Sequence, residues 1–213
     1  GKINKFSYIC IKSNIMNKHR VFKHPKTNIP YIDTDDAIVG YSKSKIAKSE
    51  DNDCCVRAFA SVTESPYDDA HAYVKKIFKR KKGGGTPRFP LTMSEREGLI
   101  TLNGYKYKGL KNHDKTTFKK PMKYYCWEDS KYKYRYVERT LDSRHYPLIT
   151  TYGKTRASQM TVGTFLKEYN IGRYLIHVRG HAFTIIDGVV VGNKCDSKQL
   201  KCRIVGAYKF YKK

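Results

Sequence analysis

A cysteine and a histidine in this sequence have neighbours that suit a nucleophilic site. Cys54 follows the polar run SEDND at 49–53, in which Asn52 or Asp53 is a good N-cap for a helix. A thiol attacks a carbonyl carbon as the thiolate, and both a helix N-terminus and a nearby imidazolium lower its pKa. Cys54 has the first feature, and His181, predicted at the start of a strand, supplies the second. The pair predicts catalysis by a thiolate.

Other polar residues are candidates for supporting this pair. A group that accepts a hydrogen bond from the imidazole fixes its tautomer and ring angle. Asn193 lies one hairpin strand after His181 and is the predicted partner, with Asp196 as the competing choice. The backbone N–H of Cys54 and the side-chain amide of Asn52 are predicted to form an oxyanion hole.

Two helices are predicted to position Cys54. The first covers the run CCVRAFASVT, in which apolar residues recur from Cys55 at i, i+3, i+4 and i+7, the spacing of a buried helix face. The second begins at Ser65-Pro66, a cap followed by a proline suited to the first helical turn. It continues through 78, and the Gly-rich stretch at 83–85 ends the basic segment that follows.

The remaining pattern is mostly that of β structure. A hairpin is predicted around Asn103-Gly104, a second one turns at 128–130, and a further strand covers 146–151. Thr161 is expected to cap a short helix, and Asp187-Gly188 to join two strands in a tight turn. The last predicted strands are 174–178, 182–186, 189–191 and 203–211. Helices first and then a mostly antiparallel sheet predict an α+β fold.

The predicted organisation has two parts. Residues 1–48 are basic and weakly patterned, with one candidate strand at Phe6–Ile11, and are interpreted as an N-terminal arm or as an ordered extension packed on the domain. Residues 49–213 form the domain, with a β-rich insertion at about 86–157. No internal repeat is visible.

Composition excludes several classes of protein. The 213 residues are 39% hydrophobic and 29% charged, which argues against a membrane span and against wholesale disorder. Six cysteines include no C-x-x-C pair, and the histidines show no ligand spacing, so neither a metal site nor a cofactor is predicted. No secretory signal opens the sequence, which favours a reduced, intracellular setting.

Positive charge is the strongest bulk feature of the chain. Lys and Arg number 43 against 19 Asp and Glu, a net charge of +24 that attracts polyanions at long range. DNA or RNA binding is therefore predicted, although a solvated helix face is the alternative interpretation of its densest cluster. That cluster consists of Lys75, Lys76, Lys79, Arg80, Lys81 and Lys82.

Several of these motifs together resemble phage-encoded papain-like cysteine peptidases. The matching runs are NDCCVRAFA from Asn52, YDDA shortly after it, GT at 85–86, and TVGTFLKEY with HVRGHAFTIIDGVVVGN towards the C-terminus. The resemblance implies a papain-like α+β fold and hydrolysis through a thioester, with Cys54 as nucleophile, His181 as base and Asn193 as orienting group. The sequence departs from the family in its second cysteine, Cys55, and in having Gly192-Asn193 where an Asp is usual.

Two functions are expected from these observations. The first is a viral cysteine hydrolase that cleaves a peptide, isopeptide or amide bond in a protein or peptide substrate. The second is a strongly basic protein, associated with the virion or with nucleic acid, that keeps a papain-like scaffold with little or no catalysis. In either case the expected setting is the host cytoplasm or a virus particle, with other virion proteins as partners and no membrane.

Overall fold

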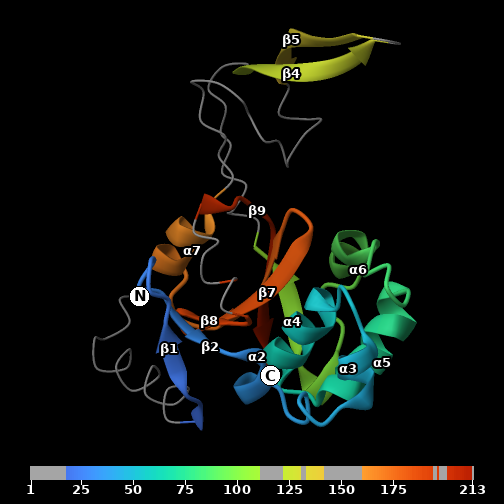
Figure 1. Cartoon of the computed structure of the whole chain (residues 1–213), viewed down its shortest axis with the longest axis vertical. Helices are drawn as coiled ribbons and strands as arrows, with labels where there is room; N and C mark the ends of the chain where they lie inside the picture. Colours follow the sequence, from blue (N-terminus) through green and yellow to red (C-terminus); the bar gives the residue numbers. More distant parts are fainter. Residues whose placement is uncertain are drawn as a thin grey trace. The chain divides into compact units, whose positions relative to one another are not determined.

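A computed structural model describes residues 18–110, 122–130, 133–141, 160–193, 196 and 201–212 (Figure 1). The chain divides into two compact units, one formed by 1–110 with 161–213 and the other by 111–160. The candidate strand at 6–11 and the one at 146–151 lie outside the described residues.

The first unit is a mixed α+β structure built on one seven-stranded sheet. Its strands run in the order β1-β2-β8-β7-β6-β9-β3, and every pairing is antiparallel except that of β2 with β8. The strands are β1 (Val21–Lys23), β2 (Pro30–Ile32), β3 (Lys106–Gly109), β6 (Arg173–Val178), β7 (His181–Ile186), β8 (Val189–Val191) and β9 (Ile204–Tyr211). The predicted fold class, α+β with a mostly antiparallel sheet, is confirmed at this level.

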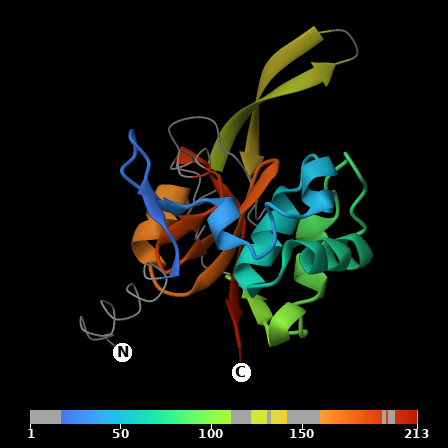
Figure 2. The same ribbon diagram turned by 60° about the horizontal axis from the view of Figure 1, so that its bottom comes forward.

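Helices cover both faces of this sheet. Figures 1 and 2 show α4 and α5 on one side and α7 on the other. Alternation along β6 explains the two faces, because Leu175 packs in the cluster around α4 while the ring of Tyr174 meets Phe165 of α7 at 5.2 Å. The helices are α2 (Thr34–Ala37), α3 (Lys45–Ser49), α4 (Cys54–Thr63), α5 (Tyr67–Phe78), α6 (Phe89–Glu95), α7 (Val162–Glu168) and the 3-10 helix η1 (Leu102–Gly104).

The segment 18–48 is an integral part of this unit. The strands β1 and β2 extend the sheet, and Ile32 and Ile38 are buried. For residues 18–48, the structure therefore agrees with an ordered extension packed on the domain and not with a separate N-terminal arm.

In the middle of the chain, one helix was not predicted and one predicted hairpin was wrong. The segment after residue 86 begins with α6, whose Phe89 and Met93 are buried one helical turn apart. Asn103-Gly104 belongs to η1 instead of a hairpin turn, and only the following residues form a strand, β3.

The second unit contains a two-stranded antiparallel hairpin. Its strands are β4 (Met122–Ser130) and β5 (Lys133–Leu141), with Ser130 paired to Lys133. The predicted hairpin is therefore present, but β4 includes 128–130, where the turn had been expected.

Candidate active site

Cys54 is the first residue of α4, as the sequence predicted. The preceding Asp53 is the N-cap residue, but its carboxylate makes no capping hydrogen bond. One of its oxygens accepts from Arg57 Nε at 2.8 Å and the other accepts from the Tyr67 hydroxyl at 2.8 Å. The Asp53 carboxylate is therefore held by side chains of α4 and α5, and the N–H of Cys54 has no acceptor within its own helix.

His181 is the first residue of β7, the strand against which α4 packs. Thr184 of β7 donates to the carbonyl oxygen of Ala58 at 2.8 Å, which ties the two elements together. Cys54 and His181 line one pocket, and a hydrogen bond between their side chains contributes to the pKa of each. The two predicted reactive residues are thus brought together by the fold.

Asp196 occupies the position predicted for Asn193. The Nε2–H of His181 donates to Asp196 Oδ1 at 2.6 Å, and the Asp196 carboxylate is buried. The side chain of Asn193 instead accepts a hydrogen bond from Thr34 at 3.0 Å, while its backbone N–H donates to Asp196 Oδ2 at 2.8 Å. The prediction that the Asn193 side chain lies against His181 was therefore wrong, and the competing residue has that contact.

The electrostatic surroundings of Cys54 and His181 favour a negatively charged thiolate and a positively charged imidazolium. Hydrogen bonds from the Cys55 thiol, from His181 and from the Ala182 backbone lower the pKa of Cys54 to about 4, against the opposing effect of burial. Burial by itself lowers the pKa of His181, but Asp196 and the Cys54 thiolate outweigh it and raise that pKa to about 9. At neutral pH the stable form is a thiolate beside an imidazolium.

Cys55 lies on the buried face of α4, as its place in the apolar stripe predicted. The negative charge of Cys54 and burial both raise the pKa of the Cys55 thiol, so it remains protonated. A protonated thiol is a weak donor. Cys55 can therefore stabilise the neighbouring thiolate as well as fill the core.

Asn52, the predicted second oxyanion donor, lines the same pocket but is engaged with a loop. Its backbone adopts a positive φ of 54°, and its side-chain Nδ2 donates to the carbonyl oxygen of Gly83 at 3.0 Å. One N–H of the Asn52 amide therefore holds the Gly-rich loop, and the other N–H is not used in that contact.

Arg80 does not belong to an exposed basic cluster. Its side chain is only 1% exposed, and its guanidinium donates to Glu50 Oε2 at 2.6 Å and to the carbonyl oxygens of Asp51 and Asn52. The prediction that Arg80 contacts nucleic acid is inconsistent with this burial. The other members of the cluster are exposed: Lys75, Lys76, Lys79, Lys81 and Lys82.

The pocket around Cys54 has a volume of about 350 Å³. One wall is the loop 84–87, and the other is formed by His177 with the turn that precedes His181. Sequence reasoning assigned no role to Thr86 or His177, although both lie in runs that carry the family resemblance, GT at 85–86 and HVRGHAFTIIDGVVVGN.

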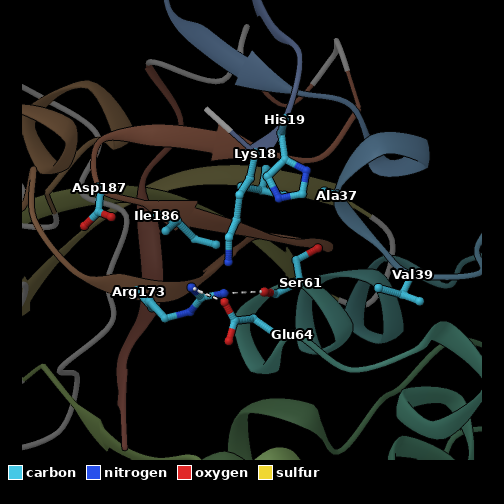
Figure 3. A pocket seen from close by; sticks show the side chains of 10 residues that line it. Lys18, His19, Ala37, Val39, Ser61, Glu64, Arg173, Ile186 and Asp187 are labelled. Carbon is cyan, nitrogen blue, oxygen red and sulfur yellow. Dashed lines mark hydrogen bonds and ion pairs between the residues drawn. The ribbon is translucent and has the colours of Figure 1, made fainter. Parts of the chain in front are cut away.

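A larger hollow of about 540 Å³ lies at the opposite end of α4. Figure 3 shows Lys18 reaching into it and Arg173 beside Glu64 and Ser61. The Arg173 guanidinium donates to the carbonyl oxygens of Ser61 and Val62 and pairs with Glu64 at 3.1 Å. These groups hold the end of α4 to β6, and the reactive thiol is not among the residues that line this hollow.

No protein-family model, no curated protein and no solved structure matches this chain. Within the described ranges, no helix is long and apolar enough to cross a membrane. The same residues include no group of three or more His, Cys, Asp or Glu side chains arranged to hold a metal ion. The functional argument therefore depends on the residues around Cys54.

Proposed function

We propose that this chain is a viral cysteine hydrolase with a papain-like fold that cleaves a peptide, isopeptide or amide bond. The observation that carries the proposal is one constellation: a thiol at a helix start, an imidazole in the same pocket, and a buried carboxylate on the far ring nitrogen. The sequence resemblance to phage papain-like peptidases supports the viral origin and the finer fold assignment.

The chemistry proceeds in two displacements. The Cys54 thiolate attacks the carbonyl carbon, and the N–H groups of Cys54 and Asn52 bind the oxyanion. The imidazolium of His181 then gives its proton to the leaving amine as the C–N bond breaks, which leaves a thioester. Water attacks the thioester with His181 as base, releasing the carboxylic acid product and restoring the thiolate–imidazolium pair.

Competitive alkylation tests the nucleophile without a known substrate. Cys202 is an exposed cysteine of the same chain, whereas Cys54 is half-buried. Exposure alone favours modification of Cys202, while thiolate activation favours Cys54. With less than one equivalent of iodoacetamide at pH 6, peptide mass spectrometry should find the label on Cys54 first. Preferential labelling of Cys202 would overturn the proposal.

Hydrolysis itself is tested with a mixed peptide library and mass spectrometry. The wild-type chain should produce new termini, and Cys54→Ala should produce none. The matched control is Cys202→Ala, which removes an exposed thiol and should leave cleavage unchanged. An intact, alkylatable Cys54 with no cleavage of peptide, isopeptide or amide substrates would favour the second candidate function.

That second candidate is a basic nucleic-acid-binding protein. It is favoured by a specific observation, the five exposed lysines Lys75, Lys76, Lys79, Lys81 and Lys82 along the end of α5 and the following loop. The two functions are compatible, since a hydrolase packaged with a genome benefits from a basic surface.

A further inference from the structure

Cys54 and Cys55 place two thiols, one ionised and one protonated, in the same pocket. Cys54 is half-buried and Cys55 is nearly covered, and both line the space of about 350 Å³ that also contains His181. A hydrogen bond joins the two sulfur groups. Peroxides oxidise accessible thiolates, and a second cysteine close by can capture the product. The pair therefore has the arrangement of an oxidisable cysteine and its resolving partner.

Oxidation of Cys54 releases Cys55 for reaction. In the resting site, the hydrogen bond with the Cys54 thiolate, burial and the Cys54 charge all raise the pKa of Cys55. A sulfenic acid on Cys54 carries no negative charge, which removes two of these three effects. The Thr86 hydroxyl and the Arg80 guanidinium act in the opposite direction and lower the pKa of Cys55. Thr86 Oγ1 is buried and lacks another hydrogen-bond partner among the described residues, so its hydroxyl is free to donate to a Cys55 thiolate.

The start of α4 suits a bond between neighbouring residues. The N–H groups of Cys54 and Cys55 lie in the first turn, where they have no acceptors within the helix. Rotation of the peptide unit between them disturbs chiefly the hydrogen bonds that Val56 and Arg57 donate to the Asp53 carbonyl oxygen, at 2.8 and 3.0 Å. Adjacent Cα atoms are about 3.8 Å apart, closer than the roughly 4.4–6.8 Å of ordinary disulfides. The resulting ring is therefore strained, and a strained disulfide is easily reduced.

We propose that Cys54 and Cys55 form a reversible modification site, in which hydrogen peroxide converts the two thiols into a disulfide between adjacent residues. The Cys54 thiolate attacks one peroxide oxygen, which forms an S–O bond, breaks the O–O bond and releases hydroxide. The Cys55 sulfur then attacks the Cys54 sulfur and displaces hydroxide, which takes the Cys55 proton and leaves as water. The peroxide gains two electrons, and the two sulfurs together lose two. A dithiol reverses the reaction by thiol–disulfide exchange.

The disulfide makes Cys54 inert as a nucleophile and protects it from irreversible oxidation to a sulfinic acid. Cys55, which departs from the family pattern, thus has a role beyond filling the core. The inference goes beyond the proposed hydrolysis, because it needs a reactive Cys54 thiolate but no substrate.

Peptide mass spectrometry of the full chain tests the modification site. Cleavage after Lys48 and Arg57 releases one peptide, 49–57, that contains both thiols. After treatment with hydrogen peroxide and blocking of free thiols, this peptide should be two hydrogens lighter than its reduced form. It should carry neither the blocking group nor dimedone, a trap for sulfenic acid. Dithiothreitol should then restore both thiols and the fast alkylation of Cys54 by iodoacetamide.

Two variants separate the resolving role of Cys55 from general oxidation. Cys55→Ser keeps the size of the side chain but cannot form an S–S bond, so Cys54 should stop at a sulfenic acid that dimedone traps. With excess peroxide and no dimedone, Cys54 of this variant should become a sulfinic acid and lose the alkylation that dithiothreitol restores in the wild type. Cys202→Ser removes an exposed thiol and is the matched control, which should recover as the wild type does. The iodoacetamide rate before oxidation reports whether each variant keeps a reactive Cys54.

The outcomes separate this site from the proposed hydrolase. A dimedone adduct or a sulfinic acid on wild-type Cys54, or a disulfide from Cys54 to another cysteine, would overturn the modification site and leave the hydrolase proposal standing. If Cys202 is oxidised before Cys54, the reactive thiolate is absent and both proposals are overturned. The mass of the wild-type peptide tests the disulfide even if Cys55→Ser does not fold.

Discussion

At the scale of single residues, the orientation of the His181 ring is set by the groups that contact its two nitrogens. Asp196 holds Nε2, which leaves Nδ1 for Cys54. The sequence offers two candidates for this contact, and the spacing of one hairpin strand after His181 favours Asn193, which is the wrong one. In the structure the Asp196 N–H donates to the Asn193 carbonyl oxygen at 2.8 Å, and the Asp196 carboxylate lies against His181. Sequence spacing alone does not reveal this contact.

Asp196 and Asn193, the two candidate partners of His181, lead to opposite predictions for mutagenesis. Asp196→Asn should reduce peptide cleavage by at least about tenfold, because an amide holds the imidazolium less strongly than a carboxylate. Asn193→Ala should have little effect, since its contact with Asp196 is through the backbone N–H, which alanine keeps. Cleavage rates of both variants, on any peptide that the wild type cleaves, decide between them. A large loss only in Asn193→Ala would contradict the assignment.

The pKa values predict a window of pH for hydrolysis. The thiolate is lost as pH falls through about 4, the pKa of Cys54, and the imidazolium is lost as pH rises through about 9, the pKa of His181. Cleavage should therefore follow a bell between these limits. Asp196→Asn should move the upper limb to lower pH, because Asp196 raises the His181 pKa. The check is a pH–rate profile, and an upper limb that does not move would contradict this assignment.

Gly192 is required by the Asp196 carboxylate. A Cβ at this position would collide with Asp196 Oδ2, and both residues are buried. Gly192→Ala should therefore displace Asp196 and reduce cleavage, although it removes no functional group. Overpacking of this kind also destabilises a protein by about 1–3 kcal/mol. The measurements are cleavage rate and urea unfolding.

At the scale of elements, the sequence predicted those with a strong local pattern. The helix at Cys54, the helix capped by Thr161 and the tight turn at Asp187-Gly188 are all present. The hairpin at Asn103-Gly104 failed because a tertiary contact overrides the local turn signal. The Asn103 side-chain amide donates to the carbonyl oxygens of Thr63 and Glu64 at the end of α4, which are distant in sequence.

The loop that leads into α4 depends on one buried ion pair. Glu50 accepts from Arg80 at 2.6 Å and from His71 at 3.0 Å, and Arg80 also holds two carbonyl groups of the loop. The sequence placed Arg80 on the surface because it sits within a run of lysines. Only the packing of α5 against this loop reveals that its guanidinium is internal. Arg80 is thus a positioning residue for Asn52 and Cys54.

Replacing Arg80 should therefore act on stability. Arg80→Met leaves the Glu50 carboxylate buried with one partner fewer, and breaking a buried pair in this way costs about 3–5 kcal/mol. Lys79→Met, at the adjacent exposed position, should change stability by no more than about 0.5 kcal/mol. Urea unfolding of both variants makes the comparison. Equal stability of the two would show that the ion pair does not hold the loop.

At the scale of the whole molecule, charge is distributed unevenly between surface and interior. The buried ionisable side chains include Asp53 and Asp196, whereas the lysines at 75, 76, 79, 81 and 82 are exposed. The guanidinium of Arg80 is buried as well, so these exposed lysines carry part of the net charge of +24 at the surface. A polyanion approaching this chain therefore meets a strongly positive field that is independent of the catalytic chemistry.

This field predicts binding to DNA or RNA that tolerates sequence and weakens with salt. For a duplex, the slope of log K against log salt is about −0.9 for each phosphate neutralised. Replacing the five exposed lysines with alanine should make that slope shallower in proportion to the contacts removed, whereas Cys54→Ala should leave it unchanged. Alanine at Lys108 and Lys209, which pair across β3 and β9, is the control for a general loss of charge. Fluorescence anisotropy with a random duplex measures each slope. If the slope lost per lysine is the same in the five-lysine variant and in the two-lysine control, the net charge binds the duplex, and the end of α5 is not a distinct interface.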